Sequence, residues 1–307
     1  MMRLLAATLL LLAMDLPARA ACPQNLSDCL GAATSFAIVA EKAILTKGIL
    51  GEFGEGVTVY GASVGDTCAP RAFVGGPNDT GTQVDNLILS GADGIVGRFV
   101  SFLSGGDPGD PGVEVSGDIV TGGGQLTGLA AVLTAGVVDT SGADPRVATC
   151  AEALSDVRTA SATLAGLTPT RDLGAVRAEP NGDYVVTLSA DPGVNVWNAT
   201  SLFAPTKHRF LGLNYTTIDV QLDPATESVI INVDRGVRVG TSSSITVSGG
   251  PPEKVVLNLV GGGTLNTDGY VDPRILAPES TVIVRVNGSV SGGAYARRVD
   301  VRGGYAF

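Results

Sequence analysis

The sequence predicts an all-β protein that folds as an irregular β-solenoid (β-helix) with one long α-helix packed along its side. Three observations lead to this fold class. First, the chain combines 42 glycines with 44% hydrophobic residues, whereas disordered chains are poor in aliphatic residues and collagen has a strict three-residue glycine period. Second, short β-rich runs separated by glycine corners recur at intervals of roughly 10 to 20 residues, without an exact repeat. Third, one segment has clear helical periodicity.

The first 20 residues have the pattern of a secretory signal peptide. A positive charge precedes a short apolar core, Leu4–Ala13, and Ala18–Ala20 supplies a small-x-small cleavage site. The apolar core is too short to span a bilayer. We therefore expect cleavage near Ala20 and a secreted protein, extracellular or at the cell surface. The alternative, a buried N-terminal helix, lacks a capping residue.

The remaining chain, residues 21–307, is predicted to form a single solenoid domain because no linker divides it. The full sequence has a formal net charge of −10, which disfavours nucleic acid as a partner. No run after residue 20 reaches the roughly 20 apolar residues of a membrane helix, so we expect no membrane span.

In the first half of the chain, several short apolar or alternating runs are bounded by glycine and are predicted to be strands. A small-residue segment, LGAATSF, precedes the first of them. The predicted strands are Phe36–Ala40, Val57–Tyr60, Ala62–Val64, Arg71–Val74, Val84–Leu89, Ile95–Phe102, Val113–Val115 and Asp118–Val120.

One segment, about Pro145–Gly166, is predicted to be a helix and interrupts the strands. Asp144 is a suitable N-cap, and Pro145 suits the first helical position. Apolar or small residues recur three or four positions apart and predict a buried stripe that packs on the side of the β-coil. We therefore interpret the helix as an insertion into a single solenoid domain. The stripe comprises Val147, Ala151, Leu154, Val157, Ser161 and Leu164.

After the helix the short strands resume, and the stretch Lys254–Gly304 is interpreted as the end of the coiled structure. Within it, Pro278 directly follows Ile275–Ala277 and is interpreted as a strand end. The predicted strands are Asp183–Leu188, Val194–Trp197, Thr216–Leu222, Ser228–Val233, Val237–Gly240, Ser244–Val247, Val255–Val260, Thr281–Val286 and Arg298–Arg302.

Two asparagines, Asn232 and Asn258, lie inside apolar runs. A buried amide must be hydrogen-bonded. Stacked coils satisfy this need when identical amides bond to one another up and down a ladder. We therefore expect these two side chains to stack.

The four cysteines are predicted to form disulfides because the protein is expected to be exported. Three connectivities are possible. We favour Cys22–Cys29, which closes a short N-terminal loop, and Cys68–Cys150, a long-range bond that ties the helix to the coil. A zinc site is the alternative, but no Cys-x-x-Cys is present and His208 is the only histidine.

These segments resemble the choice-of-anchor A family of bacterial surface and secreted proteins, within the wider ice-binding-like β-solenoid group. The resemblance rests on LGAATSF, on the helix ending in LAGLTPT, and on VIINV, VVLNLVGGG, RILAPESTVIV and SVSGGAYARRVDV. It implies a right-handed β-solenoid with a helix alongside, a role in adhesion or matrix, and no catalytic residues. The chain departs from the family at Leu257–Leu259 and carries no anchor before Phe307, so we expect an unanchored or partner-held member.

Two acidic corners are candidate calcium sites because they offer oxygen ligands close together. The first is Asn266, Asp268 and Asp272 with Gly269 between them, and the second is Asp107, Asp110 and Glu114. Neither matches a complete calcium loop, so we interpret both as polar corners, with calcium binding as the alternative.

Catalysis would need convergent carboxylates, and Asp219, Asp223 and Asp234 are the candidates for glycoside hydrolysis. We interpret them as solvated charges. We also interpret the basic segment around His208 and the glycine runs at Gly122–Gly128 and Gly261–Gly263 as surface corners. The aromatic region around Trp197 is interpreted as core, with a sugar-stacking patch as the alternative. No catalytic residue, metal ligand or cofactor is assigned.

The function predicted from these observations is that of a secreted, non-catalytic solenoid of the adhesion or extracellular-matrix type. Its expected partner is an extracellular polysaccharide, a cell surface or a matrix protein. An ice-binding protein is the first alternative, although no Thr-x-Thr file recurs at a fixed interval. A polysaccharide-active enzyme is the second.

Overall fold

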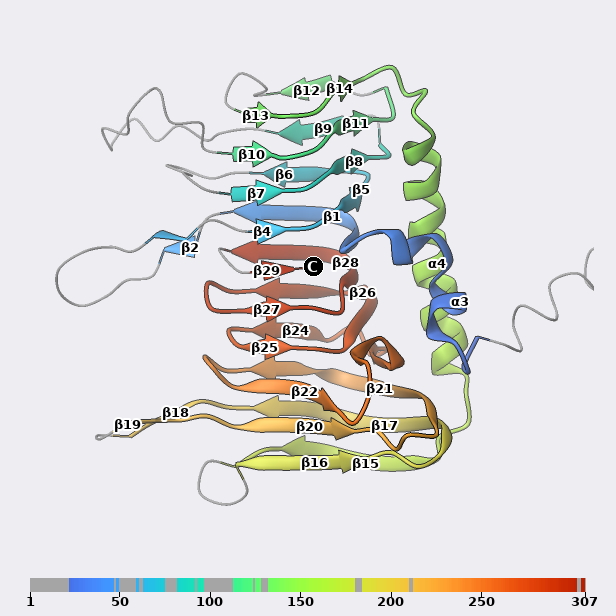
Figure 1. Cartoon of the computed structure of the whole chain (residues 1–307), viewed down its shortest axis with the longest axis vertical. Helices are drawn as coiled ribbons and strands as arrows, with labels where there is room; N and C mark the ends of the chain where they lie inside the picture. Colours follow the sequence, from blue (N-terminus) through green and yellow to red (C-terminus); the bar gives the residue numbers. More distant parts are fainter. Residues whose placement is uncertain are drawn as a thin grey trace, which may run out of the picture.

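Parallel strands stacked one above another form the body of the protein in a computed structural model (Figure 1). The structure describes residues 22–46, 48–49, 59–60, 63–74, 82–91, 93–96, 113–123, 125–127, 132–179, 184–209, 212–302 and 305–306. The predicted signal peptide and the corner at Asp107 and Asp110 lie outside these residues.

Within the described residues, fifteen strands form the larger sheet, and its neighbouring strands pair in parallel. Its main path is β14 (Val138–Asp139), β11 (Ile119–Thr121), β8 (Leu87–Leu89), β5 (Thr67–Ala69), β1 (Ile38–Thr46), β28 (Ala294–Arg302), β26 (Arg274–Val284), β23 (Val255–Leu259), β21 (Thr226–Val239), β17 (Gly193–Ala204) and β15 (Arg171–Arg177). Beside this path lie β12 (Gln125–Thr127), β9 (Asp93–Val96), β6 (Ala72–Val74) and β24 (Thr264–Thr267).

Ten shorter strands form the second sheet, which lies in front of the first in Figure 1. In order they are β13 (Val132–Thr134), β10 (Val113–Val115), β7 (Thr82–Val84), β4 (Ser63–Val64), β29 (Tyr305–Ala306), β27 (Ser289–Val290), β25 (Tyr270–Val271), β22 (Ser244–Ser248), β20 (Thr217–Gln221) and β16 (Val185–Ser189). Two small antiparallel pairs are the other strands in the part of the chain that the structure describes: β2 (Gly48–Ile49) with β3 (Val59–Tyr60), and β18 (Lys207–Arg209) with β19 (Gly212–Asn214).

The long strands cross a corner of the coil, so the larger sheet covers two faces. Ile38 and Val39 at the start of β1 pair with β5, whereas Ala43–Leu45 farther along pair with β6. We call the part of the sheet built from β14, β11, β8, β5, β23 and the first halves of the long strands the helix face. The arginine face is the part built from β12, β9, β6, β24 and the second halves. The hydroxyl face is the ten-stranded sheet.

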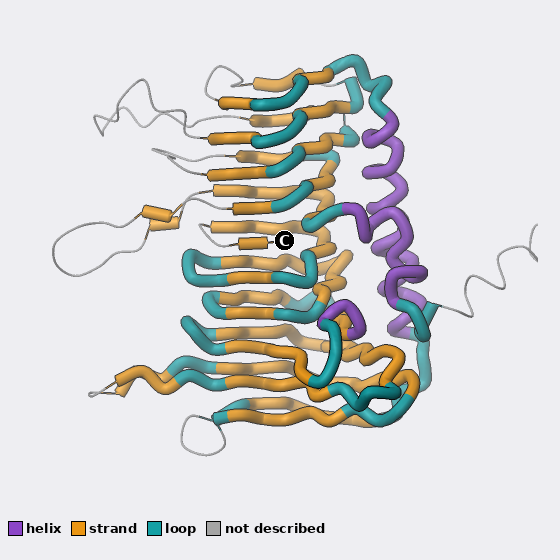
Figure 2. The backbone as a smooth tube through the Cα atoms, viewed as in Figure 1, coloured by secondary structure: helices purple, strands orange, loops and turns teal. Residues whose placement is uncertain are grey.

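The chain starts in the middle of the stack and not at one end. From β1 it climbs through β5, β8 and β11 to β14. The helix α4 (Pro145–Ala165) then runs along the side to the opposite end, and strands β15 to β28 return toward the middle (Figure 2). There β28 pairs with β1, from Ile38–Ala294 to Thr46–Arg302. The stretch Lys254–Gly304, predicted to end the coil, therefore lies at its centre.

Strand positions follow the burial of alternate side chains. In β20, Ile218 and Val220 are buried while Thr217 and Asp219 on either side reach the surface. The core inside the coil consists largely of Val, Ile, Leu and Ala. Corners need glycine where coils nearly touch: a Cβ on Gly261 would lie 1.9 Å from the carbonyl oxygen of Asp234 on the next coil.

Several predicted strand boundaries are wrong. Val84–Leu89 forms two strands, β7 and β8, because the chain turns a corner between them, and β15 was not predicted at all. Conversely, Ser228–Val233 and all of Val237–Gly240 except Gly240 belong to one bent strand, β21 (Thr226–Val239). Pro278 does not end a strand but lies within β26, where the pairing with β28 shifts register; proline is tolerated there because a bulge frees its position from the ladder.

The helix α4 occupies the range predicted from the sequence, and Asp144 caps it as expected by accepting a hydrogen bond from the Arg146 N–H. Its buried stripe differs from the prediction in the first half. Val157, Ser161 and Leu164 are buried as expected, but Ala151 is exposed, and Cys150 and Ala153 face the sheet instead. The helix is rotated toward Cys150, which is bonded to Cys68 on β5.

Both favoured disulfides are present, Cys22–Cys29 and Cys68–Cys150. The second joins α4 to the helix face. The first closes the segment that leads into α3 (Leu26–Leu30) and the 3₁₀ turn η1 (Gly31–Ser35), which pack against α4. There the Ala32 N–H donates to an Asp156 carboxylate oxygen of α4 at 2.9 Å. A further 3₁₀ turn, η3, covers Pro252–Lys254. Among the described residues, no helix is long and apolar enough to cross a membrane.

The predicted asparagine ladder is present, and it also fixes the lower part of α4. The Asn258 amide donates to the Asn232 side-chain oxygen at 2.8 Å and to the Ser161 carbonyl at 3.1 Å. The Ser161 hydroxyl donates to the Asn258 side-chain oxygen at 2.7 Å, and the Asn232 amide donates to the Leu164 carbonyl at 3.3 Å. The two amides therefore connect consecutive coils with each other and with the helix.

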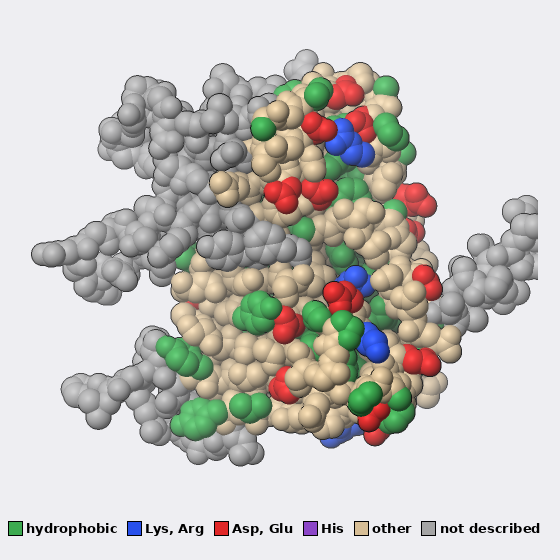
Figure 3. Space-filling view, in the orientation of Figure 1, with side chains coloured by type: hydrophobic (Ala, Val, Ile, Leu, Met, Phe, Trp, Pro, Cys, Tyr) green, Lys and Arg blue, Asp and Glu red, His purple; other side chains and the backbone are tan. Residues whose placement is uncertain are grey.

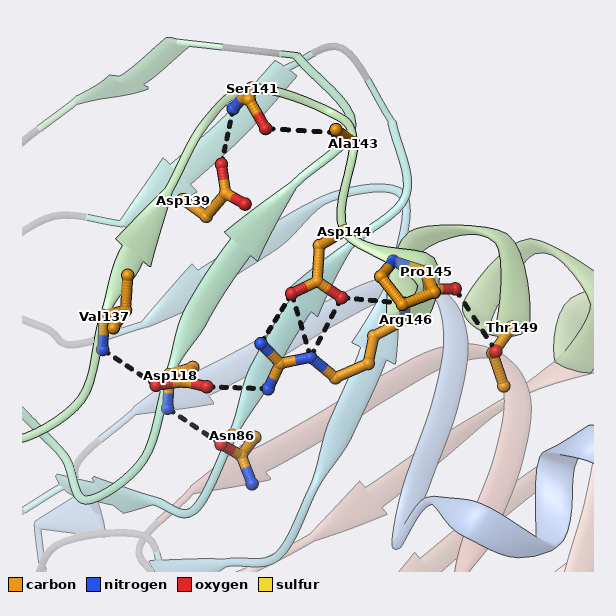
Figure 4. Close-up of polar contacts among 10 residues, drawn as sticks. All are labelled: Asn86, Asp118, Val137, Asp139, Ser141, Ala143, Asp144, Pro145, Arg146 and Thr149. Atoms are coloured by element: carbon orange, nitrogen blue, oxygen red, sulfur yellow. Dashed lines mark hydrogen bonds and ion pairs between the residues drawn. The ribbon is translucent and has the colours of Figure 1, made fainter.

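A charged cluster anchors the start of α4 to the upper coils (Figure 4). The Arg146 guanidinium donates to Asp144 at 2.7 Å and to Asp118 at 2.8 Å. Asp118 also accepts from the Val137 N–H at 2.7 Å, and its own N–H donates to the Asn86 side chain at 2.7 Å. Hydrogen bonds from Val137 and then Arg146 lower the pKa of Asp118, and those from Arg146 lower the pKa of Asp144.

We expect Asn258→Ala to reduce the free energy of unfolding by about 2 to 4 kcal/mol, because it leaves buried partners on Ser161 and Asn232 without hydrogen bonds. Urea unfolding followed by circular dichroism measures this loss. The matched control is Asn287→Ala, whose side chain is exposed in a turn, and it should change stability by no more than about 0.5 kcal/mol. Equal urea midpoints for the two variants would contradict the role of the ladder.

The cluster around Arg146 predicts a pH dependence. Because the folded-state pKa values of Asp118 and Asp144 are lowered from 3.8, their stabilising effect is fully present above that value and is lost as pH falls through the lower, folded-state values. The Tm of Arg146→Gln should therefore lie below that of the unmodified protein at pH 6, and the difference should shrink below about pH 4. A difference that stays constant from pH 6 to pH 2 would show that the cluster acts by packing alone.

Candidate adhesive faces

The helix face is covered and presents no open strand surface where α4 lies on it. Its outward side chains form a buried apolar layer with α4, α3 and η1. From the sheet this layer includes Val39, Cys68, Ile88, Val196, Ile230, Val256, Leu276 and Tyr295. Binding to an extended partner is therefore left to the other two faces, which no described helix covers.

The hydroxyl face presents short polar side chains in register across its lower strands. Figure 3 looks onto this face, where backbone and side chains that are neither hydrophobic nor charged cover most of the described surface. Alternate residues point inward to the core, and the outward ones lie in files perpendicular to the strands. The outward residues are Val185, Thr187, Ser189, Thr217, Asp219, Gln221, Ser244, Thr246, Ser248, Tyr270, Asp272, Ser289 and Ser291.

Hydrogen bonds between coils hold many of these side chains in place. The Thr217 and Ser244 hydroxyl oxygens are 2.9 Å apart. The two Asp219 carboxylate oxygens accept from the Thr246 hydroxyl at 2.9 Å and the Ser248 hydroxyl at 2.7 Å. The face is thus pre-organised, and its hydroxyl protons next to Asp219 point toward the carboxylate.

Tyr270 stands out from this face as an exposed aromatic ring, with 41% of its surface accessible. Its hydroxyl hydrogen-bonds with Asp272, and this bond raises the pKa of the phenol because ionisation would place two negative charges side by side. The Ser291 hydroxyl also donates to Asp272, at 3.1 Å. The phenol therefore stays protonated and available as a polar contact.

The arginine face has a different composition. One file of outward side chains crosses the neighbouring strands of this face. In order, its members are Arg177, Phe203, Arg238, Asn266, Ile283, Asp300 and Ile44. The guanidinium carbon of Arg177 lies 4.9 Å from the centroid of the Phe203 ring, and that of Arg238 lies 5.8 Å from it. Both guanidinium groups are therefore held against the sheet while remaining open to solvent.

Asn266, Asp268 and Asp272, the predicted calcium ligands, are not brought together as one set. Asn266 lies on the arginine face and accepts from Arg285 at 2.8 Å. The Asp268 oxygens accept from the Thr241 hydroxyl and the Asn287 N–H, and Asp272 lies on the hydroxyl face. These residues connect coils, as the polar-corner interpretation expects. Glu114 has no described side chain, and within the described part of the chain no group of three acidic, histidine or cysteine side chains could hold a metal ion.

The carboxylates considered for glycoside hydrolysis lie on separate elements. Asp219 belongs to β20 of the hydroxyl face and is engaged by Thr246 and Ser248. Asp223 accepts from the Ala225 N–H in a turn, and Asp234 belongs to β21 of the larger sheet. The arrangement offers no pair of carboxylates positioned on one face by a common strand.

The remaining candidates also have structural positions. Trp197 is 1% exposed and belongs to the core, as interpreted from the sequence. His208 lies on β18, and its side chain is outside the described residues. Gly261–Gly263 forms the corner between β23 and β24, and the run starting at Gly122 leads into β12.

Sequence reasoning missed both faces. The residues of each file are far apart in the sequence and unequally spaced; Thr217 and Ser244, for example, are separated by 27 positions. The sequence did contain one signal for the arginine face. Within strands of alternating apolar and polar residues, arginines occupy the outward positions, as Arg238 does between the buried Val237 and Val239. Strand pairing was needed to place these residues in one file.

The fold and its two open ladders define the class of protein: a β-solenoid with one helix-covered face. Residues 53–307 match the family model of the putative ice-binding-like adhesive domain. The chain belongs to this family. A comparison with curated proteins gave no match.

Similar solved structures include three ice-binding proteins. One is from the Antarctic ascomycete Antarctomyces psychrotrophicus, with 16% identity, coverage of 90% of this chain and 96% of that chain, and a TM-score of 0.45. Another is from an Antarctic biological consortium, with 13% identity, coverage of 90% and 89%, and a TM-score of 0.47. The third is a glycosylated protein from an Arctic yeast, with 16% identity, coverage of 90% and 92%, and a TM-score of 0.44. We draw no functional conclusion from likenesses of this size.

Proposed function

We propose that the protein is a secreted, non-catalytic adhesive solenoid that attaches to an extracellular polysaccharide, a cell surface or a matrix protein. The observation that carries this proposal is the pair of strand ladders left open beside a face that α4 covers. Such ladders offer a repeating array of side chains to an extended partner. Membership of the ice-binding-like adhesive family agrees with this use.

The finer features of the proposal have separate support. Two disulfides fit an oxidising, extracellular compartment, in agreement with a signal peptide cleaved near Ala20. The absence of convergent carboxylates among Asp219, Asp223 and Asp234 supports a role without catalysis. A right-handed coil, one domain over residues 21–307 and a place in the choice-of-anchor A family remain parts of the proposal.

Attachment is tested by incubating the purified secreted chain with cells, matrix polysaccharide and matrix protein of the source organism, followed by sedimentation. We expect at least one fraction to retain the protein, and retention should be abolished by unfolding it with a reductant and urea. Recovery of the folded protein in the supernatant of every fraction would contradict the proposed function.

Ice binding is a second candidate, and it rests on the hydroxyl face. Its outward files contain threonine and serine hydroxyls in register on parallel rungs, as with Thr217 and Ser244. Rungs about 4.8 Å apart give such hydroxyls a regular spacing along the solenoid axis. A regular, pre-organised array of this kind suits a crystalline surface better than a flexible chain.

Ice binding predicts thermal hysteresis and shaped ice crystals at micromolar protein. Thr217→Lys should abolish both, because it places a long charged side chain on the hydroxyl face. Thr264→Lys, an equivalent change at an exposed position of β24 on the arginine face, should preserve both. Unshaped ice with the unmodified protein would exclude this candidate and leave adhesion in place.

A further inference from the structure

Charge is segregated between the two open faces. The sequence as a whole is acidic, with a formal net charge of −10. On the hydroxyl face, the outward positions of the described strands hold Asp219 and Asp272 but no lysine or arginine. The arginine face instead carries cations on β15, β21, β28 and β1 and directly after the end of β26. They are Arg177, Arg238, Arg298, Arg302, Lys42 and Arg285.

The lower part of this face is a stack of one aromatic ring between two guanidinium groups. Phe203 pairs with Arg177 on one side and with Arg238 on the other. Cation–π contact restrains both arginines over the ring. The Arg177 side chain is 56% exposed, and its Nε also pairs with the Glu179 carboxylate at 3.1 Å, with the guanidinium edge still open to solvent. Two planar donors are therefore held in place before any ligand arrives.

The stack continues into a shallow hollow of about 380 Å³. Phe203, Arg238, Asn266 and Arg285 line it, and Arg285 is fixed by donating to Asn266 at 2.8 Å. Asp268 also borders the hollow. Its carboxylate oxygens accept from the Thr241 hydroxyl and the Asn287 N–H, which hold this one negative charge at the border of the hollow.

Farther along, the acidic group of the file is itself neutralised. Asp300 is 2% exposed and accepts hydrogen bonds from Arg298 at 3.2 Å and Arg302 at 2.7 Å. The two arginines remain 41% and 47% exposed. Because one buried carboxylate faces two partly exposed guanidinium groups, this rung also presents a net positive charge to solvent.

The ligand that fits must be anionic, extended and repetitive. Guanidinium groups bind carboxylate and sulfate groups through paired N–H donors. Rungs are about 4.8 Å apart, so Arg177 and Arg238 stand roughly 10 Å from each other along the solenoid axis. A chain that carries an anionic group on successive sugar units can meet several of these cations.

We propose that the arginine face binds an anionic polysaccharide that lies along the solenoid axis across β15, β17, β21, β24 and β26. The Arg177–Phe203–Arg238 stack and Arg285 are its central contacts. This inference rests on the proposed adhesive function and names the chemistry of its partner.

Binding is measured by biolayer interferometry with immobilised alginate as the carboxylate polymer, dextran sulfate as the sulfate polymer and dextran as the neutral control. The unmodified protein should bind at least one anionic polymer at low salt and should not bind dextran. Arg238→Gln and Arg285→Gln should each weaken binding about tenfold, the loss typical of one charge-assisted contact. Arg158→Gln, which removes an exposed arginine from α4, is the matched control and should bind normally.

Circular dichroism melts confirm that each variant is folded. The proposal would be overturned if the polymer bound Arg238→Gln, Arg285→Gln and Arg158→Gln with equal affinity. Binding would then depend on the overall charge of the protein and not on the arginine face. Tighter binding to double-stranded DNA than to either polymer would overturn it as well. If the protein sediments with a matrix fraction but binds neither polymer, the adhesive function stands and the anionic ligand is wrong. If it binds no fraction and no polymer, the adhesive function itself fails.

Discussion

The pairing of β1 with β28, continued on the hydroxyl face by the shorter pairing of β4 with β29, joins the two halves of the solenoid. A solenoid is stabilised by contacts between neighbouring coils, and here the neighbours at the centre come from the two ends of the sequence. The ladder from Ile38–Ala294 to Thr46–Arg302 joins the half built by β1 to β14 with the half built by β15 to β28. Without it, each half would expose an unpaired strand edge.

The helix reinforces this junction because it spans both halves from outside. Cys150 bonds to β5 in the upper half, and Ser161 hydrogen-bonds with Asn258 in the lower half. The same arrangement decides which surfaces remain available. α4 covers one face along both halves, so the hydroxyl and arginine faces continue across the junction as open ladders. On the arginine face the file passes from Asp300 of β28 to Ile44 of β1.

Local features were predictable from the sequence, whereas the order of the coils was not. The helix with its Asp144 cap, both disulfides and the stacking of Asn232 with Asn258 follow from short-range patterns or from the chemistry of one residue type. Which strands become neighbours depends on a chain path that begins at the centre. The arginine file needs that path, because Arg177 and Arg238 meet Phe203 only through strand pairing. The candidate calcium ligands between Asn266 and Asp272 do not form a common site, because a corner places residues that are neighbours in the sequence on different faces.

The β1–β28 pairing should make the two halves one cooperative body. Hydrogen exchange followed by mass spectrometry in increasing urea tests it directly. We expect amides of β1 and β28 to exchange as slowly as those of β21 and β26, and protection of β8 and β21 to be lost in the same transition. Loss of protection in β1 to β14 at a lower urea concentration, while β15 to β28 stay protected, would contradict it.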